Sequence, residues 1–454
     1  MALPHHRIAI VGAGFAGVGV AIRLLQRGTR DFVVLERAGD VGGTWRDNTY
    51  PGATCDVPSN LYSFSFAPNL SWTRSFSPQP EIEAYLRRCA ADFGVLPHVR
   101  FRHAVTAARW DDEGQRWLID TNSGPLSANV LVSARGPLSE PSVPALPGLS
   151  QFRGTTFHAA RWRHDHDLSG ERVAVVGTGA SAIQFVPEIQ PAVSRLLVYQ
   201  RTPPWVIPRR DRRLSTAEHA VYRAAPATQL TVRAAIYWGR EVFVAGFVGD
   251  RRRRAKRAAV AVKAARDLLH SQVADPALRN KLTPHYELGC KRILLSNDWY
   301  PALTEPNVEV VTDAIAEVGE RSIVTADGAE RPVDTIIFGT GFDVAGQAAA
   351  ESTAGADGRT LAQAWTGRIG AYKGTTVAGF PNLFLMVGPN TGLGHSSIVF
   401  IIESQIAYVL DALATMNRLG LSSIDVRSAA QASWTAEMDR RSRRTVWTGG
   451  GCRS

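Results

Sequence analysis

The sequence predicts an α/β protein made of two Rossmann-type dinucleotide-binding domains, one inserted into the other. Glycine-rich turns at residues 12–17 and 177–182 each follow an apolar strand and open a helix. The chain of 454 residues exceeds what one hydrophobic core usually serves. Apolar strands also return towards the C-terminus. We therefore expect a discontinuous first domain at 1–148 and 325–454, and a second domain at 152–324.

The first unit reads as strand 7–11, a glycine turn, helix 18–26 and strand 32–35, which ends on Glu36. The turn brings backbone N–H groups and a helix N-terminus to a pyrophosphate. A carboxylate 22 residues after Gly14, at a strand end, suits the ribose hydroxyls of FAD. The competing interpretation is an ordinary glycine turn.

The second unit repeats this order with strand 173–176, a helix through about 189, and strand 195–199. Its strand ends on Gln200 and Arg201 instead of an acid. A guanidinium pairs with a 2′-phosphate that a carboxylate would repel, so NADPH is favoured over NADH. The alternative is a surface arginine beside a proline-rich loop.

A helical insertion is predicted at about 215–280, where alanine and arginine abound. Within it, residues 234–248 are apolar on most sides. We favour a helix whose apolar side packs over a cleft, with a helix lying on a membrane surface as the alternative.

The C-terminal part is expected to close the first domain. Strand 334–338 runs into a glycine turn, and strand 383–387 is followed by the turn 388–395 and an apolar helix from about 396 to 416. The turn 388–395 could direct free N–H groups and a positive helix end towards the pyrimidine edge of a flavin. A plain loop before a buried helix is the competing interpretation.

Composition narrows the class of protein. Apolar residues make up 45% and charged residues 20%, as in an ordinary globular protein. The chain reaches a core strand within a few residues, which leaves no room for a signal peptide. No stretch approaches the ~20 apolar residues that cross a bilayer. A cytoplasmic protein without an integral membrane segment is predicted.

The four cysteines, Cys55, Cys89, Cys290 and Cys452, are scattered without a C-x-x-C pair. We expect no disulfide, no bound metal and no dithiol redox chemistry. The net charge of +10 is partly concentrated at residues 250–257. Because no nucleic-acid-binding motif accompanies this run, it is interpreted as the solvated face of a helix.

Two dinucleotide sites in one chain indicate a flavin reduced by a nicotinamide. A disulfide reductase would need a cysteine pair near the flavin, and the sequence offers none. Molecular oxygen is the natural electron acceptor that remains.

Two further motifs carry a family resemblance. The first is Phe152-x-Gly154-x-x-x-His158-x-x-x-Trp162, just before the second glycine turn. The second is Gly42-Gly43-Thr44-Trp45, followed by Tyr50-Pro51-Gly52 and Asp56. Together with both glycine turns, these strings resemble the Baeyer–Villiger monooxygenases, class B flavoproteins of the flavin-containing monooxygenase superfamily, over nearly the whole chain.

The resemblance implies which residues bind each cofactor. FAD would lie at Gly12, Gly14, Gly17, Glu36, Arg37, Gly43, Thr44, Trp45, Asp56, Gly341 and Asn390. NADPH would lie at Gly177, Thr178, Gly179, Ala180, Ser181, Gln184, Arg201 and Thr202. The signature residues would form a linker that governs domain movement; they are Phe152, Gly154, His158 and Trp162. His158 would be a linker residue and would not transfer a proton in the reaction.

The resemblance also implies Arg292 as the catalytic residue, held by Asp56 through a charge-assisted pair. In this family oxygen adds to the reduced flavin at C4a, and a fixed cation favours the anionic peroxyflavin that attacks a ketone. The product would be an ester or lactone, with sulfoxidation as a side activity. On the residues alone, Arg292 is equally well one basic residue in a basic stretch.

Two other functions stay open at this point. One is a flavin-containing monooxygenase that oxidises nitrogen or sulfur and needs no arginine at C4a. The other is a flavoprotein that oxidises NADPH without coupling. Relatives generally continue with a tryptophan-containing segment beyond the point where this sequence ends, at Ser454. Without such a segment we would expect loosely held NADP⁺ and loss of hydrogen peroxide.

Overall fold

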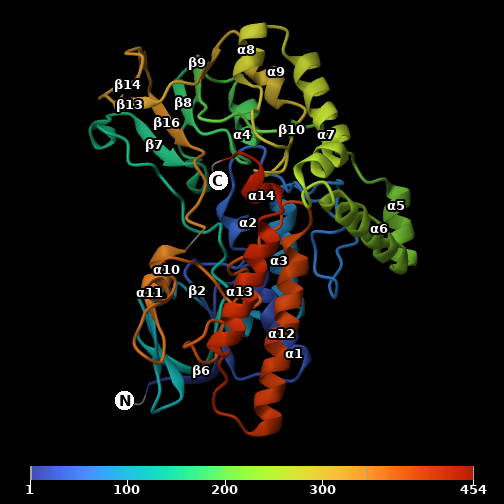
Figure 1. Ribbon diagram of the computed structural model, residues 1–454, viewed down its shortest axis with the longest axis vertical. Helices are drawn as coiled ribbons and strands as arrows, with labels where there is room; N and C mark the ends of the chain where they lie inside the picture. The colour runs from blue at the N-terminus through green and yellow to red at the C-terminus, as the bar shows by residue number, and fades with distance from the viewer. Residues whose placement is uncertain (1–2, 345, 453–454) are drawn as a thin grey trace.

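The computed structural model describes residues 3–344 and 346–452, and two large sheets organise it (Figure 1). The eight-stranded sheet has the order β17-β4-β5-β6-β1-β2-β3, with β18 beside β6. The five-stranded sheet has the order β12-β9-β8-β16-β7. We call the parts built on these sheets the first unit and the second unit. In Figure 1 the second unit lies above the first.

In the first unit, the central strand β1 runs parallel to both β2 and β6. Helix α1 packs on α12, and both contribute to the largest core cluster. The strands are β1 (His5–Val11), β2 (Phe32–Glu36), β3 (Val99–Phe101), β4 (Val105–Asp111), β5 (Arg116–Thr121), β6 (Leu126–Ser133), β17 (Thr353–Ala354) and β18 (Leu383–Leu385). The helices are α1 (Phe15–Gln26), α2 (Thr44–Asp47), α3 (Gln79–Asp92), η1 (Leu96–His98), α10 (Gln347–Glu351), α11 (Leu361–Ala364), α12 (Ile398–Leu419), α13 (Ser428–Ser442) and α14 (Val446–Gly449).

In the second unit, the five strands of the main sheet are parallel throughout. They are β7 (Thr155–His158), β8 (Arg172–Val176), β9 (Arg195–Tyr199), β12 (Val308–Val311) and β16 (Thr335–Phe338). Around them lie η2 (Leu149–Gln151), η3 (Ala159–Arg161), α4 (Ala182–Ile189), β10 (Val206–Ile207), β11 (Leu294–Leu295), α9 (Trp299–Thr304), β13 (Ile315–Val318), β14 (Ser322–Thr325) and β15 (Glu330–Pro332).

The first glycine of each turn occupies the same place in both units. Gly12 has φ of +102° and Gly177 has φ of +107°, a region that favours glycine. A Cβ on Gly12 would lie 2.6 Å from the carbonyl oxygen of Ala134, just after β6. A Cβ on Gly177 would lie 2.6 Å from the carbonyl oxygen of Gly339, just after β16. Strand β16 therefore occupies the position beside the second turn that β6 occupies beside the first.

The assignment of strand 334–338 to the first domain is therefore wrong. Residues Thr335–Phe338 form β16, which pairs in parallel with β8 and β7 inside the second unit. An apolar strand running into a glycine turn closes either unit, so the pattern alone could not say which sheet the strand joins. We propose that the units divide near residues 139–144 and 339–344, in place of 148 and 325.

The helical insertion is present as four helices, α5 (Thr216–Ala224), α6 (Ala227–Val244), α7 (Arg251–Gln272) and α8 (Pro276–Lys281). The expectation that an apolar side packs over the cleft is not met on α6. Its buried side chain is the polar Gln229, whereas Trp238 and Val242 are 66% and 74% exposed. The basic run at the start of α7 is mostly exposed, as predicted for a solvated face. Arg254 is the exception, because it is buried against Glu287 at 3.1 Å.

One helix of the described chain, α12, is long and apolar enough to cross a membrane by length and composition, contrary to the expectation that no stretch approaches that length. Its side chains Val399, Ile402, Ile406 and Val409 are buried in the core cluster that includes α1. Core packing therefore accounts for the apolar residues on this face of the helix.

The expectation that the chain lacks disulfides is wrong, because Cys290 and Cys452 are disulfide-bonded with their Cα atoms 6.0 Å apart. The bond fixes the C-terminal segment of the first unit to the segment before Arg292. The backbone N–H of Glu287 also donates to the carbonyl of Gly450 at 2.9 Å. Disulfides are rare in the cytosol, and the cytoplasmic location stays a prediction.

Candidate active site

Both glycine turns open onto one continuous cleft of about 1820 Å³ between the units. A pocket for one drug-sized ligand typically measures ~300–1,000 Å³, so this cleft has room for two large ligands. Of the residues predicted to bind cofactors, only Gly17 does not line it, because Gly17 packs inside α1 against the carbonyl of Gly12. The cleft is lined by Gly12, Gly14, Glu36, Arg37, Gly43, Thr44, Trp45, Asp56, Gly177, Thr178, Gly179, Ala180, Ser181, Gln184, Arg201, Thr202, Gly341 and Asn390.

At the first turn, the carboxylate of Glu36 is held firmly at the end of β2. It is 3% exposed, accepts from the backbone N–H of Ala13 at 2.8 Å, and accepts from the guanidinium of Arg46 at 3.0 Å. Its place beside the turn is the one that a ribose needs. Arg37, the next residue, is engaged elsewhere, because its guanidinium pairs with Glu140.

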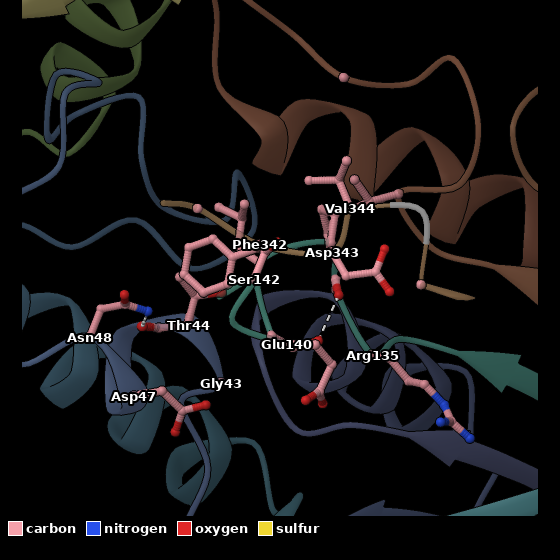
Figure 2. A pocket seen from close by; sticks show the side chains of 18 of the residues that line it. Gly43, Thr44, Asp47, Asn48, Arg135, Glu140, Ser142, Phe342, Asp343 and Val344 are labelled. Atoms are coloured by element: carbon pink, nitrogen blue, oxygen red, sulfur yellow. Dashed lines mark hydrogen bonds between the residues drawn. The ribbon is translucent and has the colours of Figure 1, made fainter. Parts of the chain in front are cut away.

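Two antiparallel connections join the units along one side of the cleft. Figure 2 shows Ser142 and Phe342 on these connections facing Thr44 of the first unit. The backbone N–H of Asp343 donates to the carbonyl of Glu140 at 2.9 Å, drawn as a dashed line in Figure 2. The predicted FAD residue Gly341 belongs to the second of these two connections.

Polar atoms that face the first part of the cleft are available to a ligand. Ser396 is 5% exposed and lines the cleft, yet its hydroxyl has no hydrogen-bond partner among the residues that the structure describes. Trp45 on α2 donates from its indole to the hydroxyl of Tyr62 at 3.0 Å, which fixes the ring. The glycine turn leaves room for a pyrophosphate, the carboxylate of Glu36 is fixed, and the buried hydroxyl of Ser396 is unpaired within the described chain. These three features fit a bound dinucleotide.

At the second turn, two cations lie close together. Arg201 follows β9, as predicted, and Lys291 is a residue that the sequence analysis overlooked. Burial lowers the pKa of Lys291, and the positive charge of Arg201 lowers it further. Such a pair suits a phosphate. Gln184 lines the cleft, and its amide accepts from the backbone N–H of Thr54 at 3.2 Å and donates to the carbonyl of Thr54 at 3.0 Å.

Asp56 and Arg292 meet in the cleft although 236 residues separate them. The guanidinium of Arg292 donates to both carboxylate oxygens of Asp56, at 2.6 and 2.5 Å, in the bidentate geometry of a strong ion pair. A third N–H of Arg292 donates to the carbonyl of Leu393 at 3.5 Å. The sequence-predicted pair is therefore formed, and the side chain of Arg292, which lines the cleft, is 43% exposed.

The ion pair sets the charge state of both groups. Burial alone would raise the pKa of Asp56, but Arg292 outweighs burial and holds that pKa below its ordinary value. Asp56 in turn raises the pKa of Arg292. Burial also raises the pKa of Cys55 and of Tyr62, so both neighbours are neutral near pH 7. The site therefore presents one fixed, permanently charged guanidinium.

None of the signature residues Phe152, Gly154, His158 and Trp162 lines the cleft. His158 ends the edge strand β7, and its Nδ1 accepts from the N–H of Ala160 at 3.1 Å. Trp162 packs between Phe157 and Phe185, with ring centres 5.2 Å away in both cases. The ring of His158 lies edge-on to that of Phe342, which lines the cleft, with ring centres 5.6 Å apart.

Known proteins resemble the chain along almost its whole length. A family model described as pyridine nucleotide-disulphide oxidoreductase matches residues 9–229. A Baeyer-Villiger monooxygenase of Streptomyces coelicolor is 53% identical over 452 residues, covering 99% of this chain and 86% of that protein. The chain belongs to the Baeyer–Villiger monooxygenase family. A second relative of the same name, from Pseudomonas aeruginosa, is 48% identical over 99% of this chain and 85% of its own length.

Solved structures agree with this membership. The closed structure of a cyclohexanone monooxygenase superposes on this chain with a TM-score of 0.88 at 29% identity, covering 99% of this chain and 91% of that one. An oxidised steroid monooxygenase bound to NADP gives a TM-score of 0.85 at 32% identity, with 98% and 92% covered. The family resemblance, the two Rossmann-type domains with a helical insertion, and the flavoprotein monooxygenase class are confirmed.

Proposed function

We propose that this monooxygenase binds FAD at the first turn and NADPH at the second, and inserts one oxygen atom beside the carbonyl of a ketone. The reaction would consume ketone, O₂, NADPH and a proton, and would yield an ester or lactone, NADP⁺ and water. The bidentate Asp56–Arg292 pair, placed in the cleft that both turns share, is the observation that carries this proposal. When bound, FAD supplies the two-electron chemistry that links NADPH to oxygen.

The residues of the chain would divide the remaining work. Glu36 holds the ribose end of FAD, and the side-chain-free turn admits the pyrophosphate. Arg201 and Lys291 select the 2′-phosphate of NADPH, because two cations at that place favour a doubly charged group. Bound cofactors and substrate would displace water from the cleft between the units, which would protect reactive oxygen from wasteful loss.

Arg292 would favour the negative charge that develops on oxygen and then on the attacked carbonyl. A guanidinium fixed before the reaction stabilises such charge without the cost of reorganising water. Asp56 fixes the direction of that guanidinium. The apolar and aromatic residues of the cleft leave room for a small ketone, or for a sulfide as a side substrate, and O₂ needs no dedicated polar group.

A panel of substrates tests the proposal. Purified enzyme with FAD and NADPH is supplied with a cyclic ketone, a thioether or a tertiary amine, and product is measured against NADPH consumed. We expect ester or lactone from the ketone, and a much smaller yield from Arg292→Ala. Oxidation of the amine and the thioether without any ester, or equal ester from Arg292→Ala, would contradict the proposal.

A further inference from the structure

One face of α6 reaches from the insertion into the first unit through long polar side chains. Gln229, Arg233 and Arg240 are four and seven residues apart, which places them within an arc of about 40° on a helix. The amide of Gln229 donates to the side chain of Asn60 at 3.1 Å. The guanidinium of Arg233 donates to the carbonyl of Ser63 at 2.9 Å. This face therefore forms hydrogen bonds with the segment that follows Asp56 in the chain.

Arg240 extends the same face to the other side of the active site. Its guanidinium donates to the carbonyl of His395 at 2.9 Å. Arg292 donates to the carbonyl of Leu393, two residues earlier. Two arginines thus hold neighbouring carbonyls of one loop, the loop that enters α12. The adjacent Glu241 is directed at the ring of His395, with Nε2 and Oε1 3.3 Å apart.

The charge of Arg240 acts on the catalytic pair as well. Burial would raise the pKa of Asp56, and Arg292 and then Arg240 lower it. Burial lowers the pKa of Arg240 itself, and Asp56 opposes that effect. Taken alone, the Asp56–Arg292 pair is neutral and would attract an anion weakly. With Arg240 the three groups carry a net charge of +1.

Four other titratable groups lie close to this cluster: Cys55, Tyr62, Glu241 and Arg209. Cys55 and Tyr62 face Asp56 and are neutral near pH 7, because burial raises the pKa of both. The carboxylate of Glu241 is directed at the ring of His395, 3.3 Å away. Arg209 also acts on Asp56 by its charge, and it is paired with Asp211 at 3.9 Å.

We propose that Arg240 is a positioning residue for oxygen transfer: it shares the charge of Asp56 with Arg292 and holds the 393–395 loop in place. Asp56 then compensates only part of the positive charge of Arg292, and the remainder is directed at the cleft. The role of this remaining charge in catalysis rests on the proposed function, whereas the coupling of Arg240 to Asp56 does not.

Thermal unfolding of the holoenzyme tests the coupling without any turnover. Arg240→Met should lower Tm by several degrees when Asp56 is present, because it removes a favourable charge pair. In an Asp56→Asn background the same change should cost less than half as much, since Arg240 then keeps only its bond to the carbonyl of His395 and repels Arg292. Equal losses of Tm in both backgrounds would overturn the proposed coupling.

The pH profile of ester formation tests the catalytic role. Removing one nearby charge should move the acid limb of kcat upward by about one pH unit in Arg240→Met. Arg240→Lys keeps the charge and should restore the limb, whereas the matched control Glu241→Gln removes the other contact to His395 and should leave it in place. An unmoved limb in Arg240→Met, or no rescue by lysine, would overturn this role. Failure of the proposed function would instead appear as absence of ester from the unmutated enzyme.

Discussion

Replacing Arg292 by methionine probes the chemistry of the site with little change in side-chain volume. At about 4 Å and an effective dielectric constant of about 20, a guanidinium and an oxyanion attract each other by about 4 kcal/mol. The Arg292 side chain is 43% exposed, so water in the cleft screens part of this attraction. We therefore expect a loss of about 2–3 kcal/mol, or roughly 30- to 160-fold in kcat for ester formation.

The fate of NADPH separates this effect from damage to the fold. Stopped-flow measurement should find that NADPH still reduces the flavin of Arg292→Met, whereas the reoxidised enzyme releases hydrogen peroxide in place of ester. Arg292→Lys keeps a charge but cannot bind Asp56 through two parallel bonds, so its kcat should be intermediate. A kcat within threefold of the unmutated value in Arg292→Met would refute the reasoning.

Three further predictions concern other parts of the molecule. Arg201→Gln should raise KM for NADPH by about tenfold while changing KM for NADH little, as steady-state kinetics would show, because one cation at the 2′-phosphate is lost; equal effects on both would argue against that site. Cys290→Ser should lower Tm, since a bridge across 162 residues contributes up to about 5 kcal/mol in the chain-entropy model. If neither this change nor dithiothreitol treatment of the unmutated enzyme lowers Tm, the bond to Cys452 does not stabilise the protein. Asp56 has a depressed pKa in the folded protein, so its stabilising effect should be complete above its unfolded pKa of about 3.9 and disappear as pH falls through the folded value. Asp56→Asn should therefore lower Tm more at pH 7 than at pH 3, and equal losses of Tm at the two pH values would contradict this reasoning.

The sequence predicted those parts of the site that local patterns encode. A glycine turn between a strand and a helix identifies itself, so Gly12, Gly177 and the carboxylate of Glu36 lie where they were expected. The pairing of Asp56 with Arg292 was predicted from the family resemblance, not from spacing. The structure then brings the two groups into bidentate contact.

The missed features depend on contacts between distant segments. The Cys290–Cys452 bond joins residues 162 positions apart, and no motif accompanies such a pair. Strand β16 has the same pattern as a closing strand of either unit. Arg240 lies among apolar residues of α6, so only the packed helix reveals that its guanidinium reaches the active site.

The most direct measurement of the central claim is the fate of ¹⁸O₂ in a reaction with NADPH and a cyclic ketone. Mass spectrometry of the product and titration of hydrogen peroxide report where each oxygen atom goes. We expect a lactone that carries one ¹⁸O atom and forms in close to equal amount with the NADPH consumed. Consumption of NADPH that yields hydrogen peroxide in equal amount, with no labelled lactone, would contradict the account.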